Sequence, residues 1–399
     1  MKVAFVWQRF LPYHVARLAA VKIVLERAGA RLVPVEVASQ DASYAFPGSC
    51  LAEIEPVVRV LGTTNYHAHG AAEILGRVLA CLERESPDVV FCPSTAFPEG
   101  MAGVRYRCRS RGRVTIMDDA WGMTDRRGAF TRAAKRLIHR NVDAAFVPAP
   151  SHAGYYRTLG FPDERIFFGV DAVDNRHFVF QTGRLRERVE QLRSSLALPP
   201  RHFLFVGRLL PRKGVELLLG AYAAYRASAA APWGLVLVGT GPEEERMRAL
   251  ASRVEGVIFA GPRYGAGLCE NFACAGALVV PSDSDPWALV VNEGAASSLP
   301  LIVSRGCGAA ATLVEEGVNG WTFAPGDARS LATLLERMAV LTDARRQAMG
   351  DRSREIVAGC SLDHFSTGVL GALSVTRRPP AGPIADALTH LWKGRVSVN

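Results

Sequence analysis

The sequence predicts an α/β protein with two doubly wound parallel-sheet domains. The chain has 399 residues, which is too long for one ordinary hydrophobic core and suits two domains. Short apolar runs alternate with amphipathic helical patterns, as is typical of parallel sheets with helical crossovers. The alternation stops in a charged stretch that ends in two prolines, and it starts afresh at about residue 200. We therefore expect two such domains in tandem.

In the first half, the apolar runs predict strands at residues 3–7, 31–37, 88–92, 113–117 and 143–148, with helices between them, including 15–28 and 71–84. The stretch "GRLRERVEQLRSSLALPP" then leads to Pro199 and Pro200. We place the N-terminal domain at residues 1–178 and an interdomain linker at 179–200.

In the second half, strands are predicted at residues 202–207, 233–239, 256–261, 277–282, 300–304 and 320–325. We place the C-terminal domain at 201–360. A helix is expected at 361–374, and "RRPPAGP" breaks the pattern before the short helix "IADALTHLW". We expect the segment 361–399 to return to the N-terminal domain.

The composition is that of a globular protein, with 49% hydrophobic and 21% charged residues. No signal peptide or spanning segment is expected, because the first apolar run has only five residues and none reaches eighteen. The eight cysteines form no CxxC pair, which favours reduced thiols and a cytoplasmic location. The net charge of +9 is compatible with nucleic acid, an anionic membrane surface or an anionic substrate, and does not choose among them.

One segment of the N-terminal domain is strongly basic. Residues 105–140 contain eleven Lys or Arg against three Asp. In "RYRCRSRGR" the arginines alternate, which on a helix scatters them around its surface. Two interpretations stay open: a solvated face, or a surface that docks to an anionic membrane or to an acceptor bearing phosphate or carboxylate.

The first candidate site follows the first strand of the second domain. In "FLFVGRLLPRKGVELLLGAY", Gly207, Arg208 and Lys213 lie in a loop before a helix. Ligands of open parallel sheets bind beyond the carboxyl ends of the strands. Two cations and close backbone N–H groups suit a phosphate, although a pair of solvated loop charges would look the same.

Two later stretches add to this candidate site. Gly239 and Gly241 in "VLVGTGPEEE" make a tight turn, but without a third glycine a dinucleotide fingerprint is weak. In "PSDSDPWALVVNEGAAS", Asp285 has a structural alternative as a helix N-cap. Glu293 stands inside an apolar helix and needs a polar partner, for which two ribose hydroxyls are well suited.

With these residues in view, the chain resembles a known family. "FVGRLLPRKG", "LVGTGPEEE", "VVPSDSDPWALVVNEGAASSLPLIVS" and "LVEEGVNGWTFAPGD", in this order and spacing, are similar to the C-terminal half of retaining nucleotide-sugar glycosyltransferases of family 4. The resemblance covers about residues 200–330. It implies the GT-B fold, in which two Rossmann-like domains face a central cleft.

The resemblance implies a role for each matching residue. Arg208 and Lys213 would hold the donor diphosphate, and Glu293 would bind the ribose. Asp285 replaces the first glutamate of the family's Glu-x7-Glu pattern, which shortens the side chain by one methylene and leaves its role near the transferred sugar in doubt. The remaining donor contacts expected are Gly207, Gly239, Gly241, Arg263, Ser282, Leu289 and Val290.

The N-terminal half matches less closely, as expected of a domain that receives a variable acceptor. "RVTIMDDAW" resembles a strand that usually ends in His-Asp, and here Asp118 and Asp119 take those places. They are either an acidic turn or ligands of a sugar hydroxyl. In "QRFLPYHVARL", Gln8, Arg9 and His14 are candidates for acceptor contacts, although a histidine at a helix start is more often a cap.

The expected function is retaining, metal-independent transfer of a sugar from a nucleoside diphosphate sugar to an acceptor that the sequence does not name. No metal is expected, because Asp283-Ser284-Asp285 is too short a match to a metal-binding Asp-x-Asp. No cofactor and no nucleic-acid partner are expected either. Peripheral membrane contact through the basic N-terminal surface stays open. The alternatives are a non-catalytic nucleotide-binding or scaffolding relative, a nucleotide-sugar epimerase and, least supported, an NAD-dependent oxidoreductase.

Overall fold

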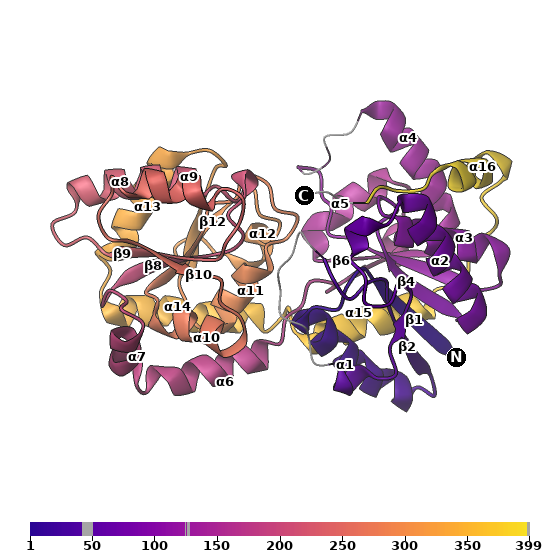
Figure 1. Ribbon diagram of the computed structural model, residues 1–399, viewed down its shortest axis with the longest axis horizontal. Coiled ribbons are helices and arrows are strands. Elements are labelled where there is room, and N and C mark those ends of the chain that lie inside the picture. Colours follow the sequence, from indigo (N-terminus) through magenta and orange to yellow (C-terminus); the bar gives the residue numbers. More distant parts are fainter. Residues whose placement is uncertain (42–50, 124, 126–127, 397–399) are drawn as a thin grey trace. The chain divides into compact units, whose positions relative to one another are not determined.

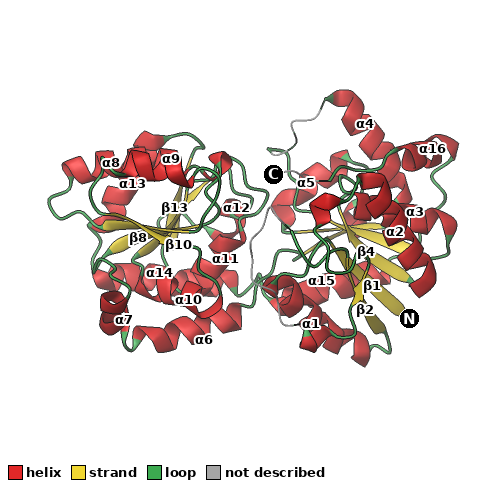
Figure 2. Cartoon of the chain, viewed as in Figure 1, coloured by secondary structure: helices red, strands yellow, loops and turns green. Residues whose placement is uncertain are grey.

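A computed structural model of the chain describes residues 1–41, 51–123, 125 and 128–396. They form two compact units, one of Met1–Ala172 with Leu362–Asn399, the other of Val173–Ser361. Each unit is a parallel sheet with helices on both faces (Figures 1 and 2). The expected α/β class with two doubly wound sheets is confirmed.

The first unit has a seven-stranded sheet in the order β3-β2-β1-β4-β5-β6-β7. Its strands are β1 (Lys2–Trp7), β2 (Arg31–Glu36), β3 (Val58–Arg59), β4 (Val89–Pro93), β5 (Arg113–Met117), β6 (Ala144–Val147) and β7 (Ile166–Phe168). Its helices are α1 (Pro12–Arg27), α2 (Ala71–Glu85), α3 (Pro98–Arg109), α4 (Ala129–Ile138), α5 (Pro150–Thr158), α15 (Leu362–Ser374) and α16 (Pro383–Leu391), with short 3₁₀ turns at Ala52–Ile54, Tyr66–Ala68, His139–Asn141 and Asp163–Arg165.

The second unit has a six-stranded sheet in the order β10-β9-β8-β11-β12-β13. Its strands are β8 (His202–Val206), β9 (Gly234–Val238), β10 (Val257–Gly261), β11 (Ala277–Val280), β12 (Leu301–Ser304) and β13 (Gly320–Phe323). Its helices are α6 (Asn175–Arg186), α7 (Val189–Ser195), α8 (Val215–Ser228), α9 (Glu244–Ala251), α10 (Gly265–Cys274), α11 (Leu289–Ala296), α12 (Ala310–Leu313), α13 (Ala328–Ala339) and α14 (Asp343–Val357), with a 3₁₀ turn at Pro211–Lys213.

The order of the strands reverses in the same way in both sheets. In each, the first strand of the unit lies in the middle, the next two strands extend to one side and the later strands to the other. The reversal falls between β1 and β4 in the first sheet and between β8 and β11 in the second. The loops at the carboxyl ends of these four strands are where a doubly wound fold binds its ligands.

The crossing between the units differs from the predicted linker. The chain enters the second unit at Val173, and residues 179–200 contribute to α6 and α7, which pack on α10 of that unit. The stretch resembled a linker because it is highly charged and each helix buries little: Thr182 is buried in α6 and Leu192 in α7. On the return, α15 packs on α1, β6 and β7 of the first unit.

The stretch Asp343–Ser374 is long and apolar enough, by length and composition alone, to cross a membrane. It joins α14 of the second unit to α15 of the first. Helix α15 places Phe365, Val369 and Ala372 in the core of the first unit, which accounts for its apolar face.

Candidate functional site

The loops at the carboxyl edge of the second sheet touch one another through backbone atoms. Leu209 N–H donates to Thr240 O (2.9 Å), and Asp283 N–H donates to Arg212 O (2.9 Å). The loop after β8 is thereby joined to the loops after β9 and β11.

Glycine is required for this close approach. A Cβ on Gly239 would lie 1.9 Å from the carbonyl oxygen of Gly207, and one on Gly214, whose φ is +69°, would lie 2.1 Å from that of Pro281. Only glycine avoids both the steric clash and the cost of a left-handed backbone at such a place. The glycines predicted from the sequence therefore shape the edge at the β8–β11 reversal.

At this edge the structure brings Lys213 and Asp285 together. Lys213 ends the 3₁₀ turn Pro211–Lys213, and its Nζ donates to Asp285 Oδ2 at 2.5 Å. The backbone of Asp285 is held by Gly306 O (2.9 Å) and Gly308 N–H (3.0 Å). Both side chains are largely shielded from solvent, with 18% of Lys213 and 9% of Asp285 exposed, so the pair is only weakly screened.

The alternative role of Asp285 as an N-cap is wrong. Helix α11 begins at Leu289, and its N-cap position is Ala288, whose side chain makes no capping bond. Asp285 lies too early to reach the first turn and pairs with Lys213 instead. Ala288 itself adopts φ +76°, a conformation that costs a residue with a Cβ about 1–2 kcal/mol.

Glu293 lies in the middle of α11, as predicted. Its side chain is partly open to solvent, yet burial among apolar neighbours raises its pKa to about 8. Among the described residues its carboxyl group has no hydrogen-bond partner, and its charge acts on the Cys269 thiol of α10. A carboxyl group in this setting is stabilised by a ligand whose hydroxyl groups form hydrogen bonds with it.

The other predicted donor contacts lie on the same loops. Arg208 follows β8, is half-buried and has contacts of its own, while Arg263 follows β10 and is exposed. Ser282 is buried beside Cys307 at the end of β11. Leu289 and Val290 form the first turn of α11 and are half-buried.

In the first unit, Gln8 and His14 are engaged locally. Gln8 Nε2 donates to Asp41 Oδ2 (2.9 Å). His14 Nδ1 accepts from the backbone N–H of Leu11 (3.1 Å) and its ring stacks on Trp7 at 4.6 Å. Burial and the nearby Arg17 guanidinium lower the pKa of His14 well below its usual range. His14 is therefore a capping residue of α1, as the second interpretation predicts. Arg9, next to Gln8, is half-buried and has contacts of its own.

Asp118 and Asp119 follow β5 as predicted. Asp118 is 8% exposed, and its Oδ2 lies 3.7 Å from Lys135 Nζ of α4. Lys135 also lies 3.4 Å from the hydroxyl of Tyr155, which donates to Asp125 Oδ2 (3.0 Å). Asp119 is half-buried and acts electrostatically on Arg17. Lys135 and Tyr155 were missed, because nothing in the sequence joins a lysine of the basic helix to an aspartate seventeen residues earlier.

The basic span 105–140 is only partly a solvated surface. Arg107 is buried and forms a two-pronged ion pair with Asp143, with Nε and Nη2 each 3.0 Å from a carboxylate oxygen. Arg105 and Arg113 donate to backbone carbonyls near the C-terminus of the chain. Arg109, Arg111, Arg132, Arg136 and Arg140 are exposed, and Arg126 and Arg127 lie outside the described residues.

Comparison with known proteins identifies the domain formed by most of the second unit. Residues 200–340 match the sequence family described as "Glycosyl transferases group 1". They form a group 1 glycosyltransferase domain. The resemblance drawn from the four motifs is confirmed, and the matched residues include the Lys213–Asp285 pair and Glu293.

Curated relatives also carry the names of glycosyl-transferring proteins. A GDP-mannose-dependent alpha-mannosyltransferase of Corynebacterium glutamicum is 29% identical over 341 residues, 80% of this chain and 77% of its own length. A sulfoquinovosyl transferase of Arabidopsis thaliana is 28% identical over 224 residues, 55% of this chain and 42% of its own length. The chain thus spans less than half of the plant protein.

The whole fold also matches solved structures. The HepE protein of Anabaena, in a crystal structure with UDP and glucose, superposes with a TM-score of 0.69 and 17% identity, covering 94% of this chain and 99% of that one. At this identity the match speaks for the fold. The two-domain GT-B fold expected from the motifs is confirmed.

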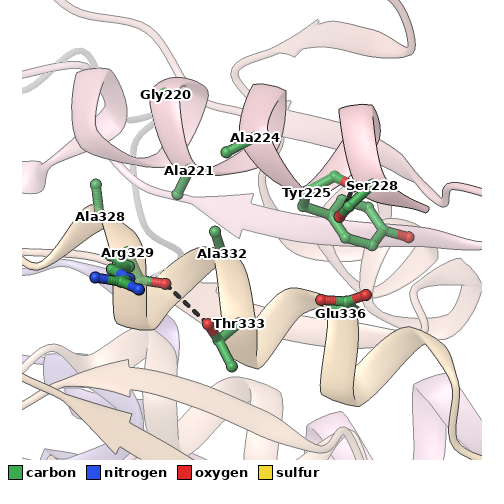
Figure 3. Close-up of a pocket in the computed structure, with 10 residues that line it drawn as sticks. All are labelled: Gly220, Ala221, Ala224, Tyr225, Ser228, Ala328, Arg329, Ala332, Thr333 and Glu336. Carbon is green, nitrogen blue, oxygen red and sulfur yellow. Dashed lines mark hydrogen bonds between the residues drawn. The ribbon is translucent and has the colours of Figure 1, made fainter.

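One hollow of the second unit lies away from these loops. It has a volume of about 280 Å³ and lies between α8 and α13 (Figure 3). Small residues line it: Gly220, Ala221 and Ala224 face Ala328 and Ala332, and the hydroxyl of Thr333 bonds within α13 to Arg329 O. The hollow is a gap between two helices, and the rest of its lining is Tyr225, Ser228, Arg329, Thr333 and Glu336.

Proposed function

We propose that this chain transfers a glycosyl group from a nucleoside diphosphate sugar to an acceptor, with retention of the anomeric configuration and without a metal. The observation that carries the proposal is the set of groups near the β8–β11 reversal: the Lys213–Asp285 pair and Arg208 on the loops, and the half-buried Glu293 on α11, whose carboxyl pKa is raised. Retention is inferred from the family resemblance.

The positive groups match the charge that develops in this reaction. As the glycosidic bond breaks, the bonding electrons pass to the diphosphate oxygen, which becomes more negative. Lys213 is already held at the edge by Asp285, so it needs little reorganisation to meet that charge. Arg208 lies on the same loop and can add a second cation. Asp285 then serves to orient Lys213 and to neutralise it while no donor is bound.

The ribose would occupy the place beside Glu293. Its two vicinal hydroxyls can bond to the carboxyl group, and the loop after β10, next to α10, would flank the base. The neighbours in the comparisons bind or use donors with different nucleotides, UDP in one crystal structure and GDP-mannose in the name of a relative. The nucleotide of this chain therefore needs a direct measurement.

Metal independence rests on the chemistry of the loops. Among the described residues, no group of three or more His, Cys, Asp or Glu side chains is placed to hold a metal ion. Asp285 is occupied by Lys213, which leaves Asp283 alone in the short acidic run. Cationic side chains would then provide the neutralisation that a divalent ion provides elsewhere.

The direct test is a thermal-shift and calorimetric screen against UDP, GDP, ADP and dTDP and their sugars, with and without EDTA. We expect one nucleotide to stabilise the protein equally in both conditions, and Glu293→Ala and Arg208→Ala to lose that stabilisation. Arg201→Ala, at an exposed pair with Asp343, is the matched control. If no nucleotide binds, the scaffolding alternative takes first place; formation of an epimer without acceptor would favour an epimerase.

Peripheral membrane contact is proposed for the face of α4 and α16 of the first unit, with anionic lipid as the partner. The two helices contact each other. Phe130 of α4 is 88% exposed, and Ile384 and Leu391 of α16 are 69% and 75% exposed. Arg132 and Arg136 are exposed one turn apart on α4. Large exposed apolar groups and cations on the same pair of helices suit the interface of an anionic bilayer.

Liposome co-sedimentation tests this contact. Binding should increase with the fraction of phosphatidylglycerol in phosphatidylcholine vesicles and fall in Phe130→Ser. Equal binding to neutral vesicles, or none to either, would contradict the proposal.

A further inference from the structure

The last part of the chain crosses the first unit as a short helix flanked by two stretches without regular structure, and it is held mainly through its backbone. We name residues 376–396 the C-terminal strap. It comprises an extended stretch, α16 and a final turn, and it runs past α3, α4 and the turn His139–Asn141 (Figure 1, yellow). A segment without regular structure must satisfy its carbonyl groups by other means.

Arginines of the first unit supply those partners. Arg165 donates to Thr376 O (2.9 Å) and Arg107 to Arg378 O (2.7 Å). Arg105 donates to three carbonyls at the end of α16, those of Thr389 (3.1 Å), His390 (2.6 Å) and Trp392 (3.0 Å). Two arginines of the basic span, Arg105 and Arg107, thus bind the strap.

The start of the strap is fixed by a buried charge. Asp143 accepts from the backbone N–H of Arg378 (2.7 Å) as well as from both prongs of Arg107. The guanidinium of Arg378 donates in turn to Gly160 O (2.9 Å). Charge-assisted bonds of this kind, shielded from water, hold the segment in one place.

The end of the strap reaches the loop Ser94–Phe97 between β4 and α3. Trp392 Nε1–H donates to Thr95 O (3.1 Å), and Arg395 N–H donates to Ala96 O (2.8 Å). Between them, Gly394 has φ +73°, and a Cβ there would lie 2.5 Å from the carbonyl carbon of Phe97. The strap therefore fits this loop closely and takes up two of its carbonyls.

The loop lies at a place that matters for a ligand. It follows β4, at the carboxyl edge and at the β1–β4 reversal, where a doubly wound sheet binds its ligand. Thr95 is buried, and its hydroxyl lies 3.0 Å from His139 Nε2, so the loop is braced from inside as well.

We infer that Trp392 and Gly394 are positioning residues, which hold the loop Ser94–Phe97 in the conformation that receives the acceptor and keeps water out of the acceptor's place. This inference rests on the proposed glycosyl transfer. The strap acts through the loop, since its contacts are to the loop's backbone.

The test uses the full chain with Trp392→Phe, which keeps an aromatic ring and removes the N–H, and Gly394→Ala, which adds the Cβ. Lys393→Ala, at an exposed position between them, is the matched control. Hydrogen exchange reports on the amides of Ala96 and Phe97, and hydrolysis of UDP-glucose and GDP-mannose reports on water as the acceptor. We expect exchange at the loop to become at least tenfold faster in both variants.

We also expect the kcat of donor hydrolysis to rise at least threefold with the donor KM unchanged, because a loosened loop admits water. Unchanged exchange at the loop would overturn the inference. Faster exchange with unchanged kcat would limit the strap to stability and overturn it as well. If the wild-type chain turns over neither donor, the proposed function fails for those donors, and the exchange result still decides whether the strap holds the loop.

Discussion

The carboxyl edges of the two sheets have the same strand reversal but are built differently. At the β8–β11 edge, three neighbouring loops touch through glycines and place Lys213 against Asp285. At the β1–β4 edge, the groups that fix the loops come from distant parts of the chain, with Asp41 on Gln8 and Trp392 on Thr95. The same topology thus supports one edge defined by local motifs and another defined by long-range contacts.

The difference explains why only one of the two edges can be recognised in the sequence. The loops at the edge of the second sheet have a backbone spacing set by glycine, so they leave a compact sequence signature. The edge of the first sheet is fixed by side chains from remote elements, so it can vary without a motif. The predictions below test this contrast, beginning with the largest expected effect.

The Arg107–Asp143 pair should dominate the stability of the first unit. Asp143→Asn leaves the Arg107 cation without a counter-charge in the interior, which costs about 3–5 kcal/mol for a buried pair. Asp163→Asn, in an exposed pair with Arg157, should change stability by less than about 1 kcal/mol. Chemical denaturation followed by tryptophan fluorescence compares the two variants, and equal losses would contradict the view that the buried pair stabilises the first unit.

At the carboxyl edge of the second sheet, Lys213→Ala should remove a preorganised cation and lower turnover roughly a hundredfold, or about 3 kcal/mol in the barrier, while the protein stays folded. Arg212→Ala, one residue earlier and exposed, should retain turnover. Steady-state rates of donor consumption check this, and near-normal turnover in Lys213→Ala would remove the residue from the proposed mechanism.

Glu293 should make stability fall as pH rises. Burial raises its pKa to about 8, so the folded protein retains a proton that the unfolded chain, with a pKa near the usual ~4.3, releases. This stabilising term is complete below that lower value and is lost as pH rises toward 8. Glu293→Gln should therefore gain thermal stability relative to wild type between pH 5 and pH 8. A Tm difference that does not change with pH would show that the carboxyl group titrates normally.

The smallest effect concerns backbone strain at the start of α11. Ala288→Gly relieves a left-handed conformation and should raise stability by up to about 1 kcal/mol, after the added freedom of glycine in the unfolded chain is subtracted. Ala296→Gly, within the same helix, should lower it by about 1 kcal/mol. Opposite signs in a denaturation series support the strain, and a loss at both positions would refute it.

The sequence by itself determined the α/β class, all six strands of the second sheet, five of the seven strands of the first, and the candidate residues Lys213, Asp285 and Glu293; the short strands β3 and β7 were missed. The features that were predicted follow from apolar periodicity and from loop glycines, both of which act over a few residues. Their predicted roles stay predictions, and the pairing of Lys213 with Asp285 in place of an N-cap needed coordinates.

Only the tertiary structure showed which side chains of the basic span are buried and where the C-terminal segment binds. Alternating arginines predict a solvated or docking surface as long as their partners are unseen. Arg107 turns inward because Asp143 balances its charge, and Arg105 turns to the carbonyls of the strap nearly three hundred residues later. A charge that is paired across such a distance leaves no periodicity in the sequence, since the folding of the whole unit brings the two partners together.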